Sequence, residues 1–300
     1  MRIGISTPVV VAVPGVHSHW ERSARIDDLS QIARKADELA FHHLTCSEHV
    51  AVPTAIAERR GGTYWDPLAT LSYIAAHTTT IKLATLVLVL GYHHPLAIAK
   101  RYGTLDTISN GRLILGVGVG SLREEFMLVG AQFEGRGAIA DESMRALRAS
   151  LGETRPSFSG EYFNFDDVYV EPTAQQSHVP LWVGGSTRRS LRRAVELGDG
   201  WVPFGRTLDE FKSMLEEVTI PDGFDVALSA GKAFDPMGAP VQTREQLCAV
   251  REAGANVTSA SLTANSVTHY LEQLEALANI RDQLDDHKWN QSDKHPDPTG

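Results

Sequence analysis

Short runs of apolar and β-branched residues alternate with stretches of helical periodicity along most of the chain. The runs predict strands at residues 2–6, 43–46, 81–89, 112–117, 180–183, 200–203, 225–229 and 256–261. The stretches predict helices at residues 27–40, 66–79, 95–109, 138–151, 187–197, 208–218, 243–253 and 267–280. Such alternation is typical of parallel strands joined by crossover helices. We therefore expect an α/β fold, a (β/α)8 TIM barrel, with a doubly wound sheet as the alternative, because periodicity does not tell whether the sheet closes.

Three connections between these elements are too long to be simple turns: residues 7–25, 50–65 and 118–137. They follow strands 1, 2 and 4, so in a parallel barrel these insertions rise from the C-terminal face, where active sites lie. Helix boundaries are clearer, since Asp66-Pro67 predicts a helix start and Ser109-Asn110-Gly111 predicts a helix end with a left-handed cap.

The domain organisation follows from the same pattern. Residues 1–280 are expected to form one barrel domain, and residues 157–170 resemble a small hairpin inserted before the fifth strand. Residues 281–300 are rich in Asp, Lys, His and Pro without apolar periodicity, which predicts a disordered tail.

The composition is that of a soluble globular protein, with 42% hydrophobic and 22% charged residues among 300. No apolar run approaches the roughly 18 residues of a membrane span, and no signal-peptide pattern precedes the first predicted strand. The net charge of −9 argues against nucleic acid as a partner. Two cysteines cannot build a disulfide framework, so we expect a reducing, cytoplasmic compartment.

A glycine-rich turn precedes the predicted helix at 187–197. Gly184-Gly185-Ser186-Thr187 follows an apolar strand and opens a helix that contains four arginines. Unpaired backbone N–H groups at such a helix start bind phosphate, and glycine permits close approach. The alternative is an ordinary glycine turn with a Ser/Thr cap.

A second glycine-rich segment, residues 116–120, does not fit the dinucleotide-binding pattern, because position 121 is serine where that pattern has glycine. Either the small residues let strand and loop pack closely, or a flat or anionic ligand lies against bare backbone. At the end of the second strand, Glu48 and His49 place a carboxylate beside an imidazole, a pair that can move protons or be purely structural.

Other catalytic classes find little support. His17-Ser18-His19 superficially resembles the His-x-His of metal-dependent barrel hydrolases, but it lies about ten residues beyond the first strand, and His-Glu-x-x-His is absent. We therefore expect no metal. There is no Gly-x-Ser-x-Gly motif of a serine hydrolase, and Cys46 lies within a predicted strand, as a core residue would.

Several segments occur in order along residues 1–205. They are LDTISNGRLILGVGVG at 105–120, REEF at 123–126, FEGRG at 133–137, PLWVGG at 180–185 and GDGW at 198–201. Together these segments resemble the bacterial luciferase-like family, specifically its branch of oxidoreductases that use the deazaflavin coenzyme F420.

The resemblance implies a (β/α)8 barrel that binds F420, or FMN in other branches, with the ring at the C-terminal mouth. It also implies a cis peptide bond not involving proline at Leu86 and Val87, and a cofactor phosphate at the 184–187 loop. The cofactor-binding residues implied are Leu86, Val87, Val89, Gly118, Gly120, Ser121, Glu124, Gly184, Gly185, Ser186 and Thr187.

In some members of that family a histidine at the position of His49 takes a substrate proton while hydride moves to the deazaflavin. Here Glu48 stands where an Asp is common, and Ser121 where many relatives carry Trp and sugar-phosphate dehydrogenases an acidic residue. We therefore expect His49 and Glu48 to be catalytic, and a small substrate other than a sugar phosphate.

Three functions stay open: an F420-dependent oxidoreductase, an FMN-dependent monooxygenase, and a non-catalytic cofactor-binding protein. The residues expected to line the substrate pocket come from the long connections and are mostly aromatic, which suggests a neutral, partly hydrophobic molecule: Trp20, Tyr64, Trp65 and His94. A homodimer is a family expectation.

Overall fold

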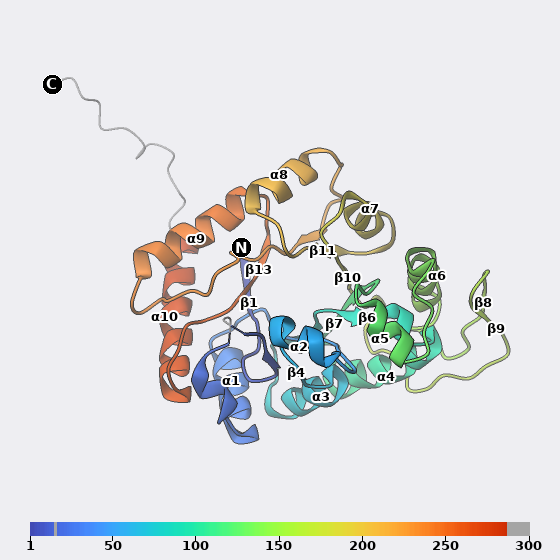
Figure 1. Cartoon of the computed structure of the whole chain (residues 1–300), viewed down its shortest axis with the longest axis horizontal. Coiled ribbons are helices and arrows are strands. Elements are labelled where there is room, and N and C mark those ends of the chain that lie inside the picture. Colours follow the sequence, from blue (N-terminus) through green and yellow to red (C-terminus); the bar gives the residue numbers. More distant parts are fainter. Residues whose placement is uncertain (15–16, 287–300) are drawn as a thin grey trace.

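Eight parallel strands curve into a barrel with helices outside it (Figure 1). The computed structural model describes residues 1–14 and 17–286. The barrel strands are β1 (Arg2–Ile5), β3 (His43–Cys46), β5 (Lys82–Thr85), β7 (Leu113–Gly118), β10 (Leu181–Gly184), β11 (Gly200–Val202), β12 (Asp225–Val226) and β13 (Val257–Ala260).

The barrel closes between its last two strands. The hydrogen-bonded order runs from β12 through β11, β10, β7, β5, β3 and β1 to β13. A parallel bridge joins Ala227 to Val257, and the Leu228 N–H donates to the Val257 carbonyl at 3.1 Å. The barrel expected from the sequence is thus confirmed over the doubly wound sheet.

Each predicted strand is present, and one is divided. The run at 81–89 forms β5, a cis peptide bond between Leu86 and Val87, and the short β6 (Leu88–Val89). Both β5 and β6 pair with β7, so the strand continues past the interruption.

The helices of the outer layer match the predicted ones to within a few residues. They are α1 (Ile26–Glu38), α3 (Pro67–His77), α4 (Pro95–Ile108), α6 (Arg136–Arg148), α7 (Arg188–Leu197), α8 (Leu208–Glu216), α9 (Pro240–Glu252) and α10 (Val267–Asp286). Asp66 caps α3 by accepting from the Ala69 N–H at 2.8 Å, and Asn110 has a φ of 56°, as the two boundary signals predict.

The long connections contain short elements that the periodicity did not show. After β1 come β2 (Val11–Ala12) and a 3-10 turn, η1 (His19–Arg22); after β3 come α2 (Thr54–Arg60) and β4 (Thr63–Tyr64). β2 and β4 pair as a small antiparallel sheet.

Further short elements lie before α4, after β7 and before β10. The 3-10 turn η2 (Leu90–Tyr92) follows β6, and α5 (Arg123–Leu128) follows β7. The expected hairpin before the fifth barrel strand is present as β8 (Phe158–Ser159) and β9 (Asn164–Phe165), which project from the barrel (Figure 1).

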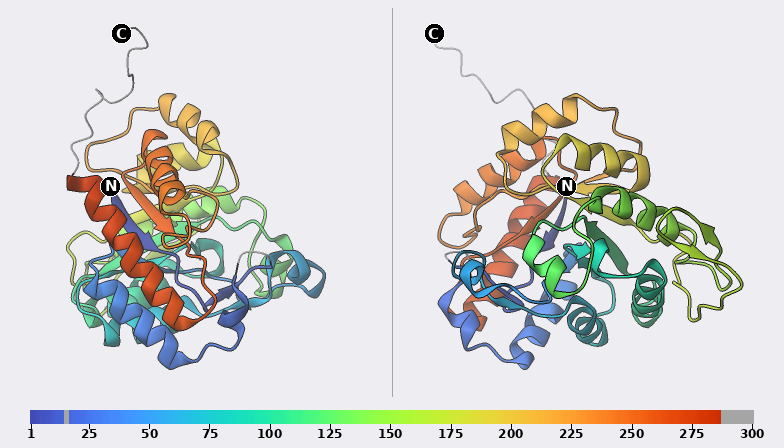
Figure 2. Two further views of the ribbon diagram at one scale, coloured as in Figure 1. Left: turned by 90° about the vertical axis from the view of Figure 1, so that its left-hand side faces the viewer. Right: turned by 45° about the vertical axis from the view of Figure 1, so that its right-hand side comes forward.

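The C-terminal boundary at residue 280 is wrong. α10 runs through Asp286 without a break and lies beside α1, so the last described helix packs on the first helix of the outer layer (Figure 2). Arg281, placed in the polar tail by its composition, donates to the carbonyls of Leu39 and Ala40 and covers the Phe41 ring. The rest of the predicted tail, residues 287–300, lies outside the described residues.

Side chains fill the barrel interior and close its N-terminal end. Trp182 is fully buried there and donates to Asp225 at 3.0 Å. Burial lowers the pKa of His42 to about 3, so this histidine packs as a neutral group. Cys46 belongs to the core as expected, and burial raises the pKa of its thiol to about 12. The open end, at the carboxyl ends of the strands, is where a ligand finds space.

Within residues 1–14 and 17–286, none of the helices is long and apolar enough to cross a bilayer. In the same part of the chain, His, Cys, Asp and Glu form no group of three or more that could hold a metal ion.

Candidate active site

A cavity of about 810 Å³ opens at the C-terminal mouth of the barrel. The segments that follow β3, β5, β7 and β10 form its walls. Ten of the residues expected to bind a cofactor lie on these walls: Leu86, Val87, Val89, Gly118, Gly120, Ser121, Gly184, Gly185, Ser186 and Thr187. Segments far apart in the chain are thus brought to one space.

Val87 stands at the centre of this wall, directly after the cis peptide bond. A Cβ atom at Gly118 would lie 2.7 Å from one Val87 methyl, and a Cβ at Gly184 would lie 2.8 Å from the other. Because neither glycine carries a side chain, Val87 can lie between β7 and β10 and face the cavity. Val87, flanked by Gly118 and Gly184, therefore forms a small apolar surface at the mouth, called the Val87 platform below.

The glycines at 116–120 serve mainly for close packing. A Cβ at Gly116 would lie 2.0 Å from the Thr85 carbonyl oxygen, which is backbone and cannot move aside. Gly120 has a φ of 75° and lies close to Phe126 and Val89. Of the two interpretations of this segment, close packing explains Gly116, while Gly118 and Gly120 are closely packed and also border the cavity.

The start of α7 provides unpaired backbone donors. The N–H of Thr187 is bonded to Ser190 Oγ, and the N–H of Ser190 to Thr187 Oγ1, each at 3.1 Å. The N–H groups of Ser186, Arg188 and Arg189 find no acceptor among the described residues. The Ser/Thr cap therefore occupies the N–H groups of Thr187 and Ser190, and three other N–H groups stay unpaired at the helix start. Thr187 borders the cavity, but its own N–H is not one of the unpaired donors.

Arginine side chains gather around the same end of the cavity. Arg136 lies over the Phe133 ring and donates to the Gly120 carbonyl at 3.0 Å. Arg193 is paired with Asp141. Arg189 is exposed, lines the cavity and makes no bond to any described residue. In a chain of net charge −9, this local excess of guanidinium groups favours an anionic ligand.

His49 lies on the opposite wall and is held by a buried carboxylate. Its Nδ1 is 2.7 Å from Glu125 Oε2, and the Glu125 side chain is fully buried. Glu125 also accepts the N–H groups of Val50 and Ala51. Since an ionised carboxylate only accepts hydrogen bonds, we assign the proton to Nδ1, which leaves Nε2 as an acceptor at the cavity.

Aromatic rings complete this wall. Tyr64 packs edge-on against His49, with the ring centroids 4.4 Å apart. Tyr92 lines the cavity beside Glu125, and burial together with that carboxylate raises the pKa of its hydroxyl. Burial also raises the pKa of the Tyr64 hydroxyl, which donates to the Arg60 carbonyl at 2.7 Å, so both phenols remain neutral beside the imidazole.

Glu48 borders the cavity but does not pair with His49. Its carboxylate accepts the Val89 N–H and the Nε2 of His93, each at 2.7 Å. These bonds fix the segment that follows the cis peptide bond. Glu48 thus positions the wall, and the carboxylate bonded to the His49 imidazole is Glu125, not Glu48.

Four other expected site residues lie away from the cavity. Glu124 is exposed on α5, about 100° around the helix from the inward-facing Glu125. Trp20 is buried against Tyr270. Trp65 packs on the core beside Cys46, and His94 caps α4 outside the cavity. Tyr64 is the one member of the predicted aromatic set that lines it.

Sequence analysis missed Glu125 as the partner of His49, and it missed the arginines at 60, 136, 189 and 193 as lining residues. A signal for Glu125 existed, because Leu122, Glu125 and Phe126 have the i, i+3, i+4 spacing of one helix face and both apolar members are buried. The arginines sit near helix starts or in an insertion, where sequence spacing does not tell which side chain turns inward.

Comparison with known proteins identifies the family of this chain. The sequence profile of a family described as luciferase-like monooxygenase matches residues 1–230. The chain belongs to this luciferase-like family.

Among curated relatives of this luciferase-like chain, an uncharacterised protein of Mycobacterium tuberculosis (strain ATCC 25618 / H37Rv) is 28% identical over 208 residues. The match spans 64% of this chain and 74% of that protein. An F420-dependent glucose-6-phosphate dehydrogenase of Amycolatopsis mediterranei (strain U-32) is 28% identical over 179 residues, 58% of this chain and 52% of that enzyme.

Solved structures of the same fold cover nearly the whole chain. The monooxygenase RslO1 of Streptomyces bottropensis has a TM-score of 0.78 at 21% identity, covering 95% of this chain and 99% of its own. An F420-dependent secondary alcohol dehydrogenase, solved with an F420–acetone adduct, has a TM-score of 0.73 at 16% identity, covering 94% and 99%.

A third similar structure is a Baeyer–Villiger monooxygenase in complex with FMN, the oxygenating constituent of 3,6-diketocamphane monooxygenase from Pseudomonas putida. It has a TM-score of 0.68 at 17% identity, covering 93% of this chain and 96% of that one. At these identities the likeness concerns the barrel itself.

Proposed function

We propose that this protein is an F420-dependent oxidoreductase that exchanges a hydride between the deazaflavin and a small organic substrate. The observation that carries the proposal is the single cavity in which the Val87 platform, the start of α7 and the His49–Glu125 pair meet. A planar ring, an anionic side chain and a proton-transfer group are the three features that such chemistry needs in one place.

The residues present fit a cofactor of this kind. Val87 and Leu86 offer an apolar surface for a ring, and the amides of Ser186, Arg188 and Arg189 offer donors to a phosphate. The unpaired Arg189 guanidinium, with Arg60 on the other side of the mouth, suits a cofactor that carries further negative charge beyond its phosphate. F420, when bound, would supply the hydride chemistry.

His49 is the group we assign to proton movement. When a substrate carbon bearing a hydroxyl gives up a hydride, the oxygen must also lose a proton, and Nε2 of His49 accepts it. Glu125 keeps Nδ1 protonated and stabilises the positive ring that results. In the reverse direction the same nitrogen returns the proton. Glu48 positions the cavity wall through Val89 and His93.

FMN-dependent oxygenation is the second candidate. It is supported by the FMN complex among the similar structures and by a phosphate site that suits either cofactor. A non-catalytic cofactor-binding protein is the third candidate, and it would have no use for a histidine oriented by a buried carboxylate.

Parallel titrations distinguish these candidates. Purified protein is titrated with oxidised F420 and separately with FMN, and cofactor fluorescence is followed in both. We expect saturable binding of F420 in the low micromolar range and much weaker binding of FMN. Tight FMN binding with a flat F420 titration would replace the proposal by the monooxygenase, and two flat titrations would remove both.

A further inference from the structure

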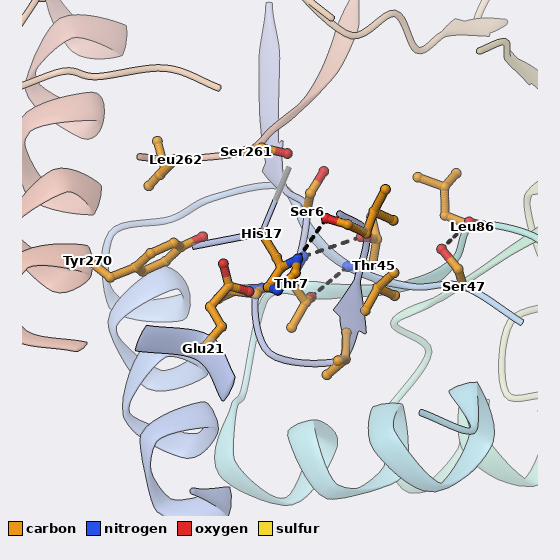
Figure 3. A pocket seen from close by; sticks show the side chains of 14 residues that line it. Ser6, Thr7, His17, Glu21, Thr45, Ser47, Leu86, Ser261, Leu262 and Tyr270 are labelled. Atoms are coloured by element: carbon orange, nitrogen blue, oxygen red, sulfur yellow. Dashed lines mark hydrogen bonds between the residues drawn. The ribbon is translucent and has the colours of Figure 1, made fainter. Parts of the chain in front are cut away.

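A second, smaller cavity of about 200 Å³ lies next to the first, between the ends of β1, β3 and β13 and the helix α10 (Figure 3). Val11, Val13, Ser47 and Leu86 line both this cavity and the larger one. The small cavity therefore adjoins the space assigned above to the cofactor. We call it the Tyr270 recess.

Hydroxyl groups make up much of its polar lining. The side chains that carry them come from the strand ends and the first turn of the chain beyond β1: Ser6, Thr7, Thr45, Ser47 and Ser261. Some of these groups already have partners. The Thr45 N–H donates to Thr7 Oγ1 at 3.0 Å, and Ser47 Oγ donates to the Leu86 carbonyl at 2.7 Å.

Tyr270 differs from Thr7, Thr45 and Ser47 because its hydroxyl oxygen is unpaired. The residue is 2% exposed, and its hydroxyl has no hydrogen-bond partner among the described residues. Figure 3 shows the ring reaching from α10 with the hydroxyl pointing into the space beside His17 and Glu21. Trp20 packs against the ring, with centroids 5.7 Å apart, so the phenol is held in this direction.

A buried donor without an acceptor is costly and uncommon in a folded protein. Burial, together with the nearby Glu21 carboxylate, raises the pKa of the Tyr270 hydroxyl, so it remains a donor. An acceptor atom supplied by a bound molecule would complete it.

The charges around the Tyr270 recess define what can enter. Glu21 accepts the N–H groups of Val9 and Ser18 at 2.8 and 2.7 Å, which fix its carboxylate at the wall. His17 has both ring nitrogens engaged, one with the Val13 carbonyl and one with Arg22. No Lys or Arg lines the recess within the described residues. A negatively charged ligand would therefore meet Glu21 without a compensating cation.

We propose that the Tyr270 recess binds the oxygen of a small neutral substrate, an alcohol or its carbonyl counterpart, through a hydrogen bond from the Tyr270 hydroxyl. This assignment of substrate class rests on the proposed function, because the recess adjoins the cofactor cavity at Ser47 and Leu86. The apolar members of the lining, Pro8, Val10 and Leu262, would contact its hydrocarbon part.

The test uses cyclohexanone as the probe, because it is neutral, compact and carries one acceptor oxygen. Its binding to the full-length protein is measured by calorimetry, with and without F420, for the wild type, Tyr270→Phe and Tyr169→Phe. Tyr169 is exposed and lies outside the recess, so Tyr169→Phe controls for loss of a phenol hydroxyl elsewhere.

We expect Tyr270→Phe to weaken cyclohexanone binding about fivefold and Tyr169→Phe to leave it unchanged. Methylenecyclohexane, which has the same shape without the oxygen, should bind wild type and Tyr270→Phe equally. Cyclohexanecarboxylate should bind the wild type more weakly than cyclohexanone does, because of Glu21. The melting temperature of Tyr270→Phe should be unchanged or higher, since no protein hydrogen bond is lost.

Equal cyclohexanone affinity in wild type and Tyr270→Phe would overturn the proposal. Failure of cyclohexanone to bind the wild type would also overturn it, and would leave ordered water as the partner of the Tyr270 hydroxyl. The proposed function fails by a different signal. A flat F420 titration removes the oxidoreductase, whereas the Tyr270-dependence of cyclohexanone binding is read in the cofactor-free protein.

Discussion

The two parts of the barrel mouth differ in the charge they present. The wall formed after β7 and β10 carries arginines at 136, 189 and 193, and backbone donors at the start of α7. The Tyr270 recess, formed after β1 and β13, carries hydroxyls and the carboxylate of Glu21, with no Lys or Arg among the described residues that line it. One side therefore favours an anion and the other a neutral molecule.

His49 lies where this difference matters most. It belongs to the larger cavity, while its neighbour Ser47 borders both. A cofactor anchored by its charge and a substrate recognised by its oxygen would thus meet where the two cavities join, at Ser47 and Leu86. Separate charge preferences would keep each molecule out of the other's place, which is specificity by exclusion as well as by attraction.

The largest expected effect comes from removing the imidazole between the two parts. In His49→Ala, turnover of the neutral alcohols found active in a screen with oxidised F420 should fall by about 10²- to 10⁴-fold. F420 affinity should change little, because the charged groups remain. The fluorescence loss on F420 reduction gives the rate, and His77→Ala, on the outer end of α3, is the control. Undiminished turnover would show that His49 does not move the proton.

Glu125→Gln keeps the shape but removes the charge that orients His49. We expect kcat to fall at least about tenfold with little change in KM, because the tautomer of His49 is no longer fixed. Glu48→Gln serves as the comparison, since Glu48 contacts His93 and Val89 instead. A larger kcat effect at Glu48 would reverse the assignment of the two carboxylates.

Arg189→Ala probes the anionic side alone. F420 affinity should weaken about fivefold at low salt and less at high salt, because a partly exposed guanidinium is screened. Arg192→Ala, on the same helix but outside the larger cavity, should have no effect. Cyclohexanone binding should be unchanged in both variants. A loss of cyclohexanone binding in Arg189→Ala would show that the two parts of the mouth are not separate.

The smallest expected effect is on the free energy of unfolding, and it comes from Asp37 at the N-terminal end of the barrel. Burial tends to raise the pKa of Asp37, but hydrogen bonds from the Thr80 hydroxyl and from the N–H groups of Thr79, Thr80 and Ile81 lower it to about 2. Because the folded pKa lies below the unfolded value of about 3.9, this stabilisation is present above pH 4 and is lost as the pH falls towards 2.

Asp37→Asn should accordingly lower the free energy of unfolding by about 1 kcal/mol at pH 7, measured by urea denaturation. The difference from wild type should shrink as the pH is lowered. Cofactor and cyclohexanone binding should be unaffected, because Asp37 lies on α1 and contacts the segment that precedes β5, at the closed end of the barrel. A difference independent of pH would show that the charge of Asp37 contributes nothing.

Much of the barrel was predictable because it depends on local patterns. Strand and helix periods, the proline after Asp66 and the left-handed Asn110 act over a few residues, and each was found. The cis peptide bond was reached through resemblance, whereas the glycines around Val87 were noted from the residues themselves as places of close approach. The end of α10 was misplaced because polar residues beyond 280 continue a helix that packs on α1.

The site shows the limit of the same reasoning. Glu48 is adjacent to His49 in the chain, yet neighbouring side chains leave a strand end in different directions, and Glu48 turns to His93. Trp20, Trp65 and His94 share their aromatic or imidazole character with Tyr64, but loop conformation sends only Tyr64 into the cavity. The residue types indicated which chemistry the side chains can perform, whereas the direction in which each side chain points depended on the tertiary structure.

The amino-acid sequence by itself determined the order of strands and helices, the helix start that can hold an anion, and the imidazole at the end of the second barrel strand. Only the tertiary structure decided that Glu125 orients His49 across 76 positions and that Tyr270 points its unpaired hydroxyl towards Glu21. The physical reason is that the helix and strand periods of a sequence act over a few residues. Closure of the barrel, driven by burial of apolar faces, brings distant segments together. The polar side chains at the mouth find their partners only in the closed barrel.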